Sequence, residues 1–250
     1  MRLALYFELA RNEMDSDYRR IFMHFIKECI NNVSDGRYYQ KYYGQNRQKE
    51  FSFAVFFDRP QFRQNKILLE SNKIKMVFTT SDTKLGMIFW NSFIAYINKA
   101  IPLSNQNEMT LTGVYKTPEQ EVKSQSILVK TMSPLVIRDH NKEGNKDFYY
   151  SVAFDNFSDI AGEIIRSQLN SSGYSKQYVD GFSITPVKAK KAVINHYGCK
   201  IEASIGEFEL CGRPLVLNYL LKAGVGSRHN EGFGAFQLIS EMQEVEKQNA

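Results

Sequence analysis

The chain has 250 residues, which is enough for one large domain or for two smaller domains that each bury a core. With 43% hydrophobic and 24% charged residues its composition is ordinary for a globular protein, and a net charge of +5 permits an anionic partner without requiring one. No segment approaches about 18 consecutive apolar residues, and Glu8 and Arg11 interrupt the N-terminal apolar run, so we expect no membrane span, no signal peptide and a cytoplasmic location.

The first half of the sequence predicts the order strand, helix, strand, strand, helix, strand. Residues 2–9 alternate apolar and polar side chains as a half-buried strand does, and residues 15–32 change to a helical period, with acids at Asp15 and Asp17 to cap the helix. The remaining elements are a strand at 50–57, a hairpin at 66–80 that turns at Ser71 and Asn72, a helix at 81–100 capped by Ser81 or Asp82, and a strand at 108–116. This is the element order of a ferredoxin-like domain.

The second half of the sequence repeats this order. Its predicted elements are strand-like segments at 125–139 and 147–154, a helix at 156–170, two strands or one long hairpin across 179–194 and 197–210, a helix at 213–224 with Pro214 in its first turn, and a strand at 234–241. We therefore predict an α+β protein of tandem ferredoxin-like (RRM-like) domains, one at residues 1–118 and the other at 119–250.

The cysteines and histidines are too scattered to indicate a metal site or a disulfide framework. Cys29, Cys199 and Cys211 include no Cys-x-x-Cys pair, and no two of the four histidines are four residues apart. We expect a reducing compartment, no metal and no cofactor. His140 and His196 are interpreted as structural or solvent-facing residues.

Residues 224–234, "GVGSRHNEGFG", form a segment that we call the glycine-rich loop. It contains four of the chain's 15 glycines, as two Gly-x-Gly triplets around a polar centre. One glycine would suffice for a helix cap and a turn into the next strand, which is the simpler interpretation. Four glycines suggest that the backbone approaches another group closely, and Arg228, His229 and Asn230 make a phosphate backbone the natural partner.

A basic cluster precedes this loop. Lys188, Lys190 and Lys191 stand in a predicted strand hairpin, and no acid occurs between Gly181 and Lys200. Charge runs are usually solvated surface, but beside the glycine-rich loop we expect these lysines to contact phosphate.

The stretch from Ile184 to Phe236 resembles the CRISPR Cas-six endoribonucleases, which belong to the repeat-associated proteins built from ferredoxin-like domains. The family signature is a Gly-hydrophobic-Gly triplet, a short polar spacer and a second such triplet, which the glycine-rich loop matches in full. Further similar features are "PVKAKK" at 186–191, "GEFEL" at 206–210, "MSPLVI" at 132–137 and "DYRRIFMHFIKECI" at 17–30. The resemblance covers nearly the whole chain and is most specific in its last third.

The resemblance implies a substrate and a reaction. Enzymes of this family cut the precursor CRISPR transcript once within each repeat, without metal, through attack of the RNA 2′-hydroxyl on the neighbouring phosphate. CRISPR repeat RNA is then the expected partner, subunits of a CRISPR effector complex are further partners, and the protein is a monomer or a homodimer. The expected RNA-binding residues are Lys188, Lys190, Lys191, Gly224, Gly226, Ser227, Arg228, His229, Asn230, Gly232 and Gly234.

The sequence departs from the family at a catalytic position. Many members carry a histidine in the loop after the first helix, but residues 36–51 contain none, and the matching position falls near Tyr42 or Tyr43. A lysine that the family often carries matches Lys49. Lys27 falls where a catalytic tyrosine or lysine can stand in the first helix.

Two catalytic schemes follow, together with one non-catalytic alternative. Either His24 transfers protons, or the enzyme works without histidine and uses Lys27, Lys49 and Arg228. If neither scheme holds, Tyr43 and His229 are the next candidates. The alternative is a non-catalytic RNA-binding subunit of the same fold. A second open question is whether the tyrosines of the loop stack on RNA bases or pack a short helix; these are Tyr38, Tyr39, Tyr42 and Tyr43.

Overall fold

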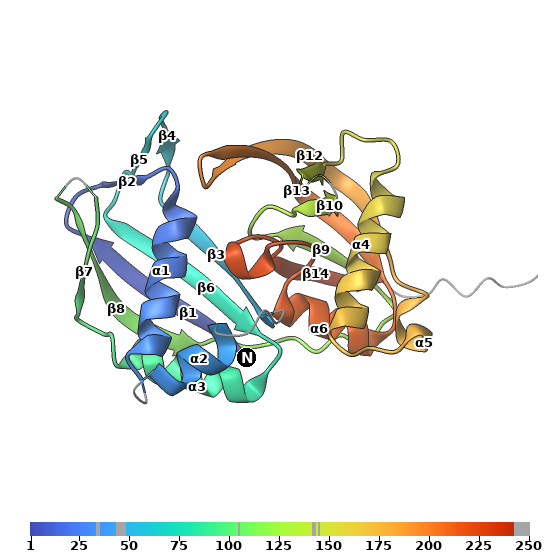
Figure 1. Ribbon diagram of the computed structural model, residues 1–250, viewed down its shortest axis with the longest axis horizontal. Coiled ribbons are helices and arrows are strands. Elements are labelled where there is room, and N and C mark those ends of the chain that lie inside the picture. Colours follow the sequence, from blue (N-terminus) through green and yellow to red (C-terminus); the bar gives the residue numbers. More distant parts are fainter. Residues whose placement is uncertain (34–35, 44–48, 105, 142–143, 145, 243–250) are drawn as a thin grey trace, which may run out of the picture. The chain divides into compact units, whose positions relative to one another are not determined.

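The computed structural model describes residues 1–33, 36–43, 49–104, 106–141, 144 and 146–242 (Figure 1). The chain divides into two compact units, which are described separately below. The N-terminal unit contains Met1–Glu119, Asn195–Lys200 and Asn230–Gly232, and the C-terminal unit contains the rest. No helix within the described ranges is long and apolar enough to cross a membrane.

The N-terminal unit is built on a five-stranded sheet in the order β3-β6-β1-β8-β7. Its strands are β1 (Arg2–Leu9), β3 (Phe51–Phe57), β6 (Lys73–Thr80), β7 (Ala100–Pro102) and β8 (Glu108–Lys116), and every neighbouring pair is antiparallel. The helices are α1 (Tyr18–Asn31), α2 (Arg37–Tyr43) and α3 (Thr83–Ile94). Without the short β7, the order β3-β6-β1-β8 is that of a ferredoxin-like sheet, so the predicted fold class is confirmed here.

The predicted alternation explains how this unit closes its core. Phe7 of β1 lies in edge-to-face contact with Phe22 and Phe25 of α1, with ring centroids 5.4 and 5.2 Å apart. Asp82 accepts a hydrogen bond from the Leu85 amide at 3.0 Å and so caps α3 as expected. Asp17 stands at the N-cap of α1 as predicted, although its side chain makes no capping hydrogen bond.

The predicted hairpin across residues 66–80 is also wrong. Residues Lys66–Leu68 form β5, which pairs with β2 (Glu13–Asp15) and β4 (Gln61–Phe62) in a separate three-stranded sheet. The Lys66 ammonium lies 2.8 Å from a carboxylate oxygen of Glu13, which favours this partner. The following residues, β6, pair instead with β1 and β3.

The C-terminal unit repeats the ferredoxin-like order. Its sheet runs β12-β13-β9-β14, from β12 (Ser183–His196), β13 (Cys199–Cys211), β9 (Ser126–Thr131) and β14 (Phe236–Met242). Its helices are α4 (Phe157–Ser171), α5 (Lys176–Val179) and α6 (Pro214–Ala223), with Pro214 at the start of α6 as predicted. The open choice at 179–210 resolves as one long hairpin, β12–β13. The tandem ferredoxin-like fold is thereby confirmed.

A second hairpin, β10 (Ile137–Asn141) and β11 (Lys146–Tyr150), stands between β9 and α4. The sequence suggested one strand-like segment across 125–139, but the strand breaks between Thr131 and Ile137. The break contains Pro134, which has no amide hydrogen to donate to a neighbouring strand. The amides of Met132 and Ser133 both donate to the Ala235 carbonyl. This break turns β10 away from the main sheet, in which it has no place.

Candidate functional site

The glycine-rich loop is closed by hydrogen bonds within the C-terminal unit. Gly224 caps α6 with φ 96°, and its amide donates to the Leu220 carbonyl at 2.9 Å. The side chain of Gln168 donates to the Gly224 carbonyl and accepts from the Gly226 amide, both at 2.8 Å. The Ser227 amide donates to the Val136 carbonyl at 2.8 Å. Much of the loop's backbone hydrogen bonding is therefore internal.

Two glycines of the loop are required by the protein's own backbone. A Cβ on Gly226 would lie 2.7 Å from the Val136 carbonyl oxygen, and one on Gly234 would lie 2.0 Å from the Val225 carbonyl oxygen. Both glycines are buried and have positive φ. The close backbone approach that the sequence predicted is real, but the approaching group is another part of the chain.

The remaining loop residues divide between the two units. Ser227 accepts a hydrogen bond from the Arg138 amide at 3.2 Å, and His229 is buried at the start of a short 3-10 helix, His229–Glu231. Asn230 is half-buried in the N-terminal unit. In the same unit the Gly232 carbonyl accepts from Arg19 Nε at 3.1 Å, and a Cβ on Gly232 would lie 2.8 Å from the Phe53 ring. Direct RNA contact by these residues stays a prediction.

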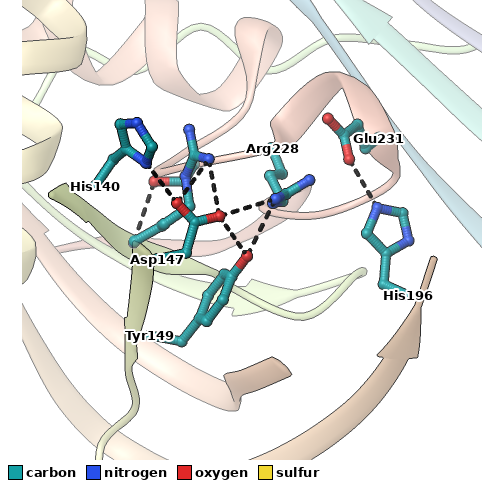
Figure 2. Close-up of polar contacts among 8 residues, drawn as sticks. His140, Asp147, Tyr149, His196, Arg228 and Glu231 are labelled. Atoms are coloured by element: carbon teal, nitrogen blue, oxygen red, sulfur yellow. Dashed lines mark hydrogen bonds and ion pairs between the residues drawn. The ribbon is translucent and has the colours of Figure 1, made fainter. Parts of the chain in front are cut away.

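Arg228 belongs to a polar network in the C-terminal unit. Figure 2 shows its guanidinium directed at Asp147 and Tyr149 of β11, with Nη2 3.3 Å from the carboxylate and 3.1 Å from the phenol oxygen. Arg228 itself has φ 55°, which a non-glycine residue rarely adopts. Its backbone and its side chain are both held in place.

Lys49 and Lys27 lie near one another in the N-terminal unit. Partial burial lowers the pKa of Lys49, the positive charge of Lys27 lowers it further, and the negative charge of Glu231 opposes both effects. Lys27 is half-buried on α1, and Lys49 lies two residues before the start of β3. The fold thus brings together two of the predicted catalytic residues and adds a carboxylate from the glycine-rich loop, which sequence reasoning did not select.

His24 and Tyr43 are the other predicted catalytic residues. The His24 side chain is 75% exposed and lies 3.6 Å from Glu28, one turn later on α1. Tyr43 ends α2, and its side chain lies outside the described part of the chain, as does that of Tyr42. Tyr38 and Tyr39 pack partly buried against the N-terminal core, which favours a packing role for these two tyrosines.

His196, which we interpreted as structural or solvent-facing, is buried in the N-terminal unit. Its Nε2 lies 2.7 Å from a carboxylate oxygen of Glu231 (Figure 2), and its Nδ1 lies 3.9 Å from Asp17. Burial raises the pKa of Asp17, against the opposing effects of His196 and Arg20. This histidine therefore fixes the carboxylate that acts on Lys49. Among the described residues no group of three or more His, Cys, Asp and Glu side chains is arranged to hold a metal ion.

The lysines of β12 occupy two different environments in the C-terminal unit. Lys188 and Lys190 line a pocket of about 560 Å³ together with Lys130 and Glu207. Lys191 instead forms an ion pair with Glu202. The three lysines are therefore not equivalent.

A family model described as "CRISPR associated protein Cas6, C-terminal" matches residues 116–238. This C-terminal part of the chain belongs to the Cas6 family. This is the Cas-six family whose glycine signature the sequence carries. No curated protein matches the sequence of this Cas6 chain.

Solved structures share the fold of this Cas6 protein over 96–97% of the chain. A structure described as a Cas6-related gene product from Pyrococcus furiosus covers 97% of this chain and 99% of its own, with a TM-score of 0.81 and 17% identity. A RAMP protein described as binding different RNA substrates covers 96% and 100%, with a TM-score of 0.80 and 16% identity. A Cas6 product complex covers 96% and 100%, with a TM-score of 0.68 and 14% identity. At these identities the likeness is one of fold.

The unequal lysines of β12 give a first prediction for this Cas6 protein. Alanine at both Lys188 and Lys190 should weaken binding of repeat RNA and flatten its salt dependence, by roughly 0.7–0.9 in the slope of log K against log salt for each phosphate that the protein no longer neutralises. Lys191→Ala should change the slope less, because Glu202 already pairs with that ammonium. Titrations at several salt concentrations measure both slopes, and equal slopes for wild type and double variant would make the cluster ordinary solvated surface.

Proposed function

We propose that this Cas6 protein is a metal-independent endoribonuclease that cuts precursor CRISPR RNA within each repeat to give guide RNA. The observation that carries the proposal is the lysine pair of the N-terminal unit, in which Lys27 and Glu231 act electrostatically on a partly buried Lys49. A group whose pKa is perturbed by burial together with a specific charged neighbour is typical of acid–base chemistry. The Cas6 family assignment supports RNA as the substrate.

The reaction that fits these groups uses the RNA as its own nucleophile. The 2′ oxygen bonds to phosphorus and loses its proton, the bond from phosphorus to the 5′ oxygen breaks, and the 5′ oxygen takes up a proton. The products are a 2′,3′-cyclic phosphate, or the 3′-phosphate that its hydrolysis gives, and a 5′-hydroxyl. Proton transfer and stabilisation of charge on phosphorus can both be supplied by side chains.

Lys49 is proposed as the general acid for the leaving 5′ oxygen. A lowered pKa makes its ammonium a stronger acid, and Lys27 supplies a positive charge for the phosphorus centre. Arg228 and the lysines of β12 are proposed to bind the RNA backbone. His24 remains the alternative proton-transfer group, at a highly exposed position beside Glu28 on α1.

A non-catalytic role in a CRISPR effector complex is the second candidate function. It is favoured by one observation, the absence of any histidine from residues 36–51. Both functions require binding of repeat RNA, so only the chemistry distinguishes them.

The test is a single-turnover assay with end-labelled repeat RNA in the presence of EDTA. We expect one cut per repeat, a cyclic phosphate or 3′-phosphate on one product and a 5′-hydroxyl on the other. A 2′-deoxy substitution at the cut site should abolish cleavage and leave binding nearly intact, because it removes only the nucleophile. Cleavage of the deoxy substrate, or loss of cleavage in EDTA, would contradict the mechanism, and tight binding without any cut would favour the non-catalytic role.

A further inference from the structure

Asp147 is the centre of a cationic network that includes Arg228, and the proposed function gives the other members of this network no role. Its carboxylate accepts from Arg138 Nη1 at 3.1 and 3.2 Å and from the Tyr149 hydroxyl at 3.1 Å, and it pairs with Arg228 at 3.3 Å. His140 Nδ1 lies 2.8 Å from it (Figure 2). All five residues belong to the C-terminal unit.

The hairpin register explains how the network assembles. In the β10–β11 pair, Arg138 stands opposite Tyr149 and His140 stands opposite Asp147. Residues two apart in a strand share one face, so all four side chains project from the same side of the hairpin. Arg228 reaches this face from the glycine-rich loop. The network therefore joins that loop to the hairpin.

The charges of the network do not cancel. Two guanidiniums pair with one carboxylate. Each guanidinium has five N–H donors, so the two arginines together have more donors than one carboxylate can accept. Burial alone would raise the pKa of Asp147, but hydrogen bonds from His140, Arg138 and Tyr149 and the charge of Arg138 lower it to about 2. The carboxylate is thus ionised at any physiological pH, and a net positive charge remains around it.

The network is also open to solvent. The side chains of Arg138, Asp147 and Arg228 are 34, 23 and 22% exposed, so a ligand can reach part of each arginine side chain, although Nε of Arg228 is buried. A guanidinium fixed in place by a carboxylate loses less conformational entropy when it binds a second anion. These features together indicate a preformed anion site rather than a closed structural ion pair.

We propose that Asp147 is a positioning residue, which holds Arg138 and Arg228 so that together they bind one phosphate group of the repeat RNA. This inference rests on the proposed RNA substrate and adds to it a defined phosphate subsite. Asp147 itself repels the RNA, so its contribution acts only through the two arginines. Tyr149 completes the arrangement, because its hydroxyl donates to Asp147 and accepts from Arg228.

The experiment asks whether loss of the Asp147 charge strengthens or weakens the binding of repeat RNA. Asp147→Asn removes one negative charge and so raises the net charge of the protein by one. Simple electrostatics therefore predicts tighter RNA binding. A positioning role predicts the opposite, a loss of about 5- to 30-fold in affinity, which is the equivalent of one or two kcal/mol. Glu163→Gln is the matched control, because it makes the same change in net charge at an exposed position on α4. That control should bind repeat RNA as well as wild type or slightly better.

Tyr149→Phe is the second variant, since it leaves every charge in place and removes only the bridging hydroxyl. It should also weaken binding, and Asp147→Asn and Arg228→Ala together should cost less than the sum of their separate effects. Thermal melting checks that each protein is folded. If Asp147→Asn and Tyr149→Phe both bind RNA as tightly as wild type or tighter, the inference is wrong. If wild type itself fails to bind repeat RNA, the proposed function fails instead.

Discussion

Replacing Lys49 by arginine should slow single-turnover cleavage of repeat RNA by about 10²–10⁴-fold, the usual contribution of a general acid or base. Arginine keeps the positive charge, but its pKa is too high for it to release a proton. Lys49→Ala removes both the charge and the proton and should be at least as slow. Binding of the uncleaved 2′-deoxy RNA should change much less than the rate in either variant.

The pH dependence of the rate identifies the role of Lys49. An acid must be protonated to act, so the rate should fall as pH rises through the lowered pKa of Lys49. If Lys49 acted as a base, the rate would rise with pH over the same range. His24→Ala should slow cleavage little in this scheme. If it slows cleavage as much as Lys49→Arg does, His24 is the proton-transfer group instead. Full activity in a Lys27→Ala, Lys49→Ala double variant would place the site elsewhere.

The fold could be predicted because its information is local. The alternation at Leu3, Leu5 and Phe7 and the helical stripe of α1 each define an element without reference to the rest of the chain, and the element order then defines the fold. The hairpin at 66–80 failed for the opposite reason. β5 pairs with the adjacent β4 and with β2, a three-residue strand more than 50 positions earlier, and nothing in residues 66–80 encodes either partner.

The candidate site could be predicted only in part. Lys27 and Lys49 were selected through a family resemblance, whereas Glu231 and His196 become relevant only where the fold brings them together. The alternation of Arg138 with His140 and of Asp147 with Tyr149 is visible in the sequence and could have indicated one shared face. Their connection to Arg228 depends on a backbone with positive φ, which no side-chain pattern encodes.

The glycine-rich loop shows the same limit most clearly. Its composition correctly indicated close backbone approach, but a glycine that admits a phosphate and one that admits a carbonyl look alike in a sequence. The contacts of Gly226 and Gly234 with the carbonyls of Val136 and Val225 give a structural reason for both glycines. A loss of RNA binding in a glycine variant is therefore informative only when its stability is also measured.

Gly234→Ala should lower the free energy of unfolding by about 4 kcal/mol or more, which is exceptional for a single substitution. Gly234 has φ 60°, and a conformation of this kind costs a non-glycine residue roughly 1–2 kcal/mol. The larger part of the loss should come from the new Cβ, which would lie 2.0 Å from the Val225 carbonyl oxygen. A backbone atom cannot move aside as the end of a side chain can, so the loop and β14 would have to shift.

Gly173→Ala is the matched control in the same unit. Gly173 also has positive φ, at 90°, but a Cβ there would meet nothing within 4 Å, so this variant should show the conformational cost alone, about 1–2 kcal/mol. Urea unfolding of both variants measures the difference, which isolates the contact of Gly234 with Val225. If the two variants are equally stable, that contact relaxes freely, and a ligand that approaches the loop becomes the better explanation for glycine at position 234. If Gly234→Ala is much less stable than Gly173→Ala, packing explains the second Gly-x-Gly triplet of the loop. RNA recognition is then assigned to Arg228 and its neighbours.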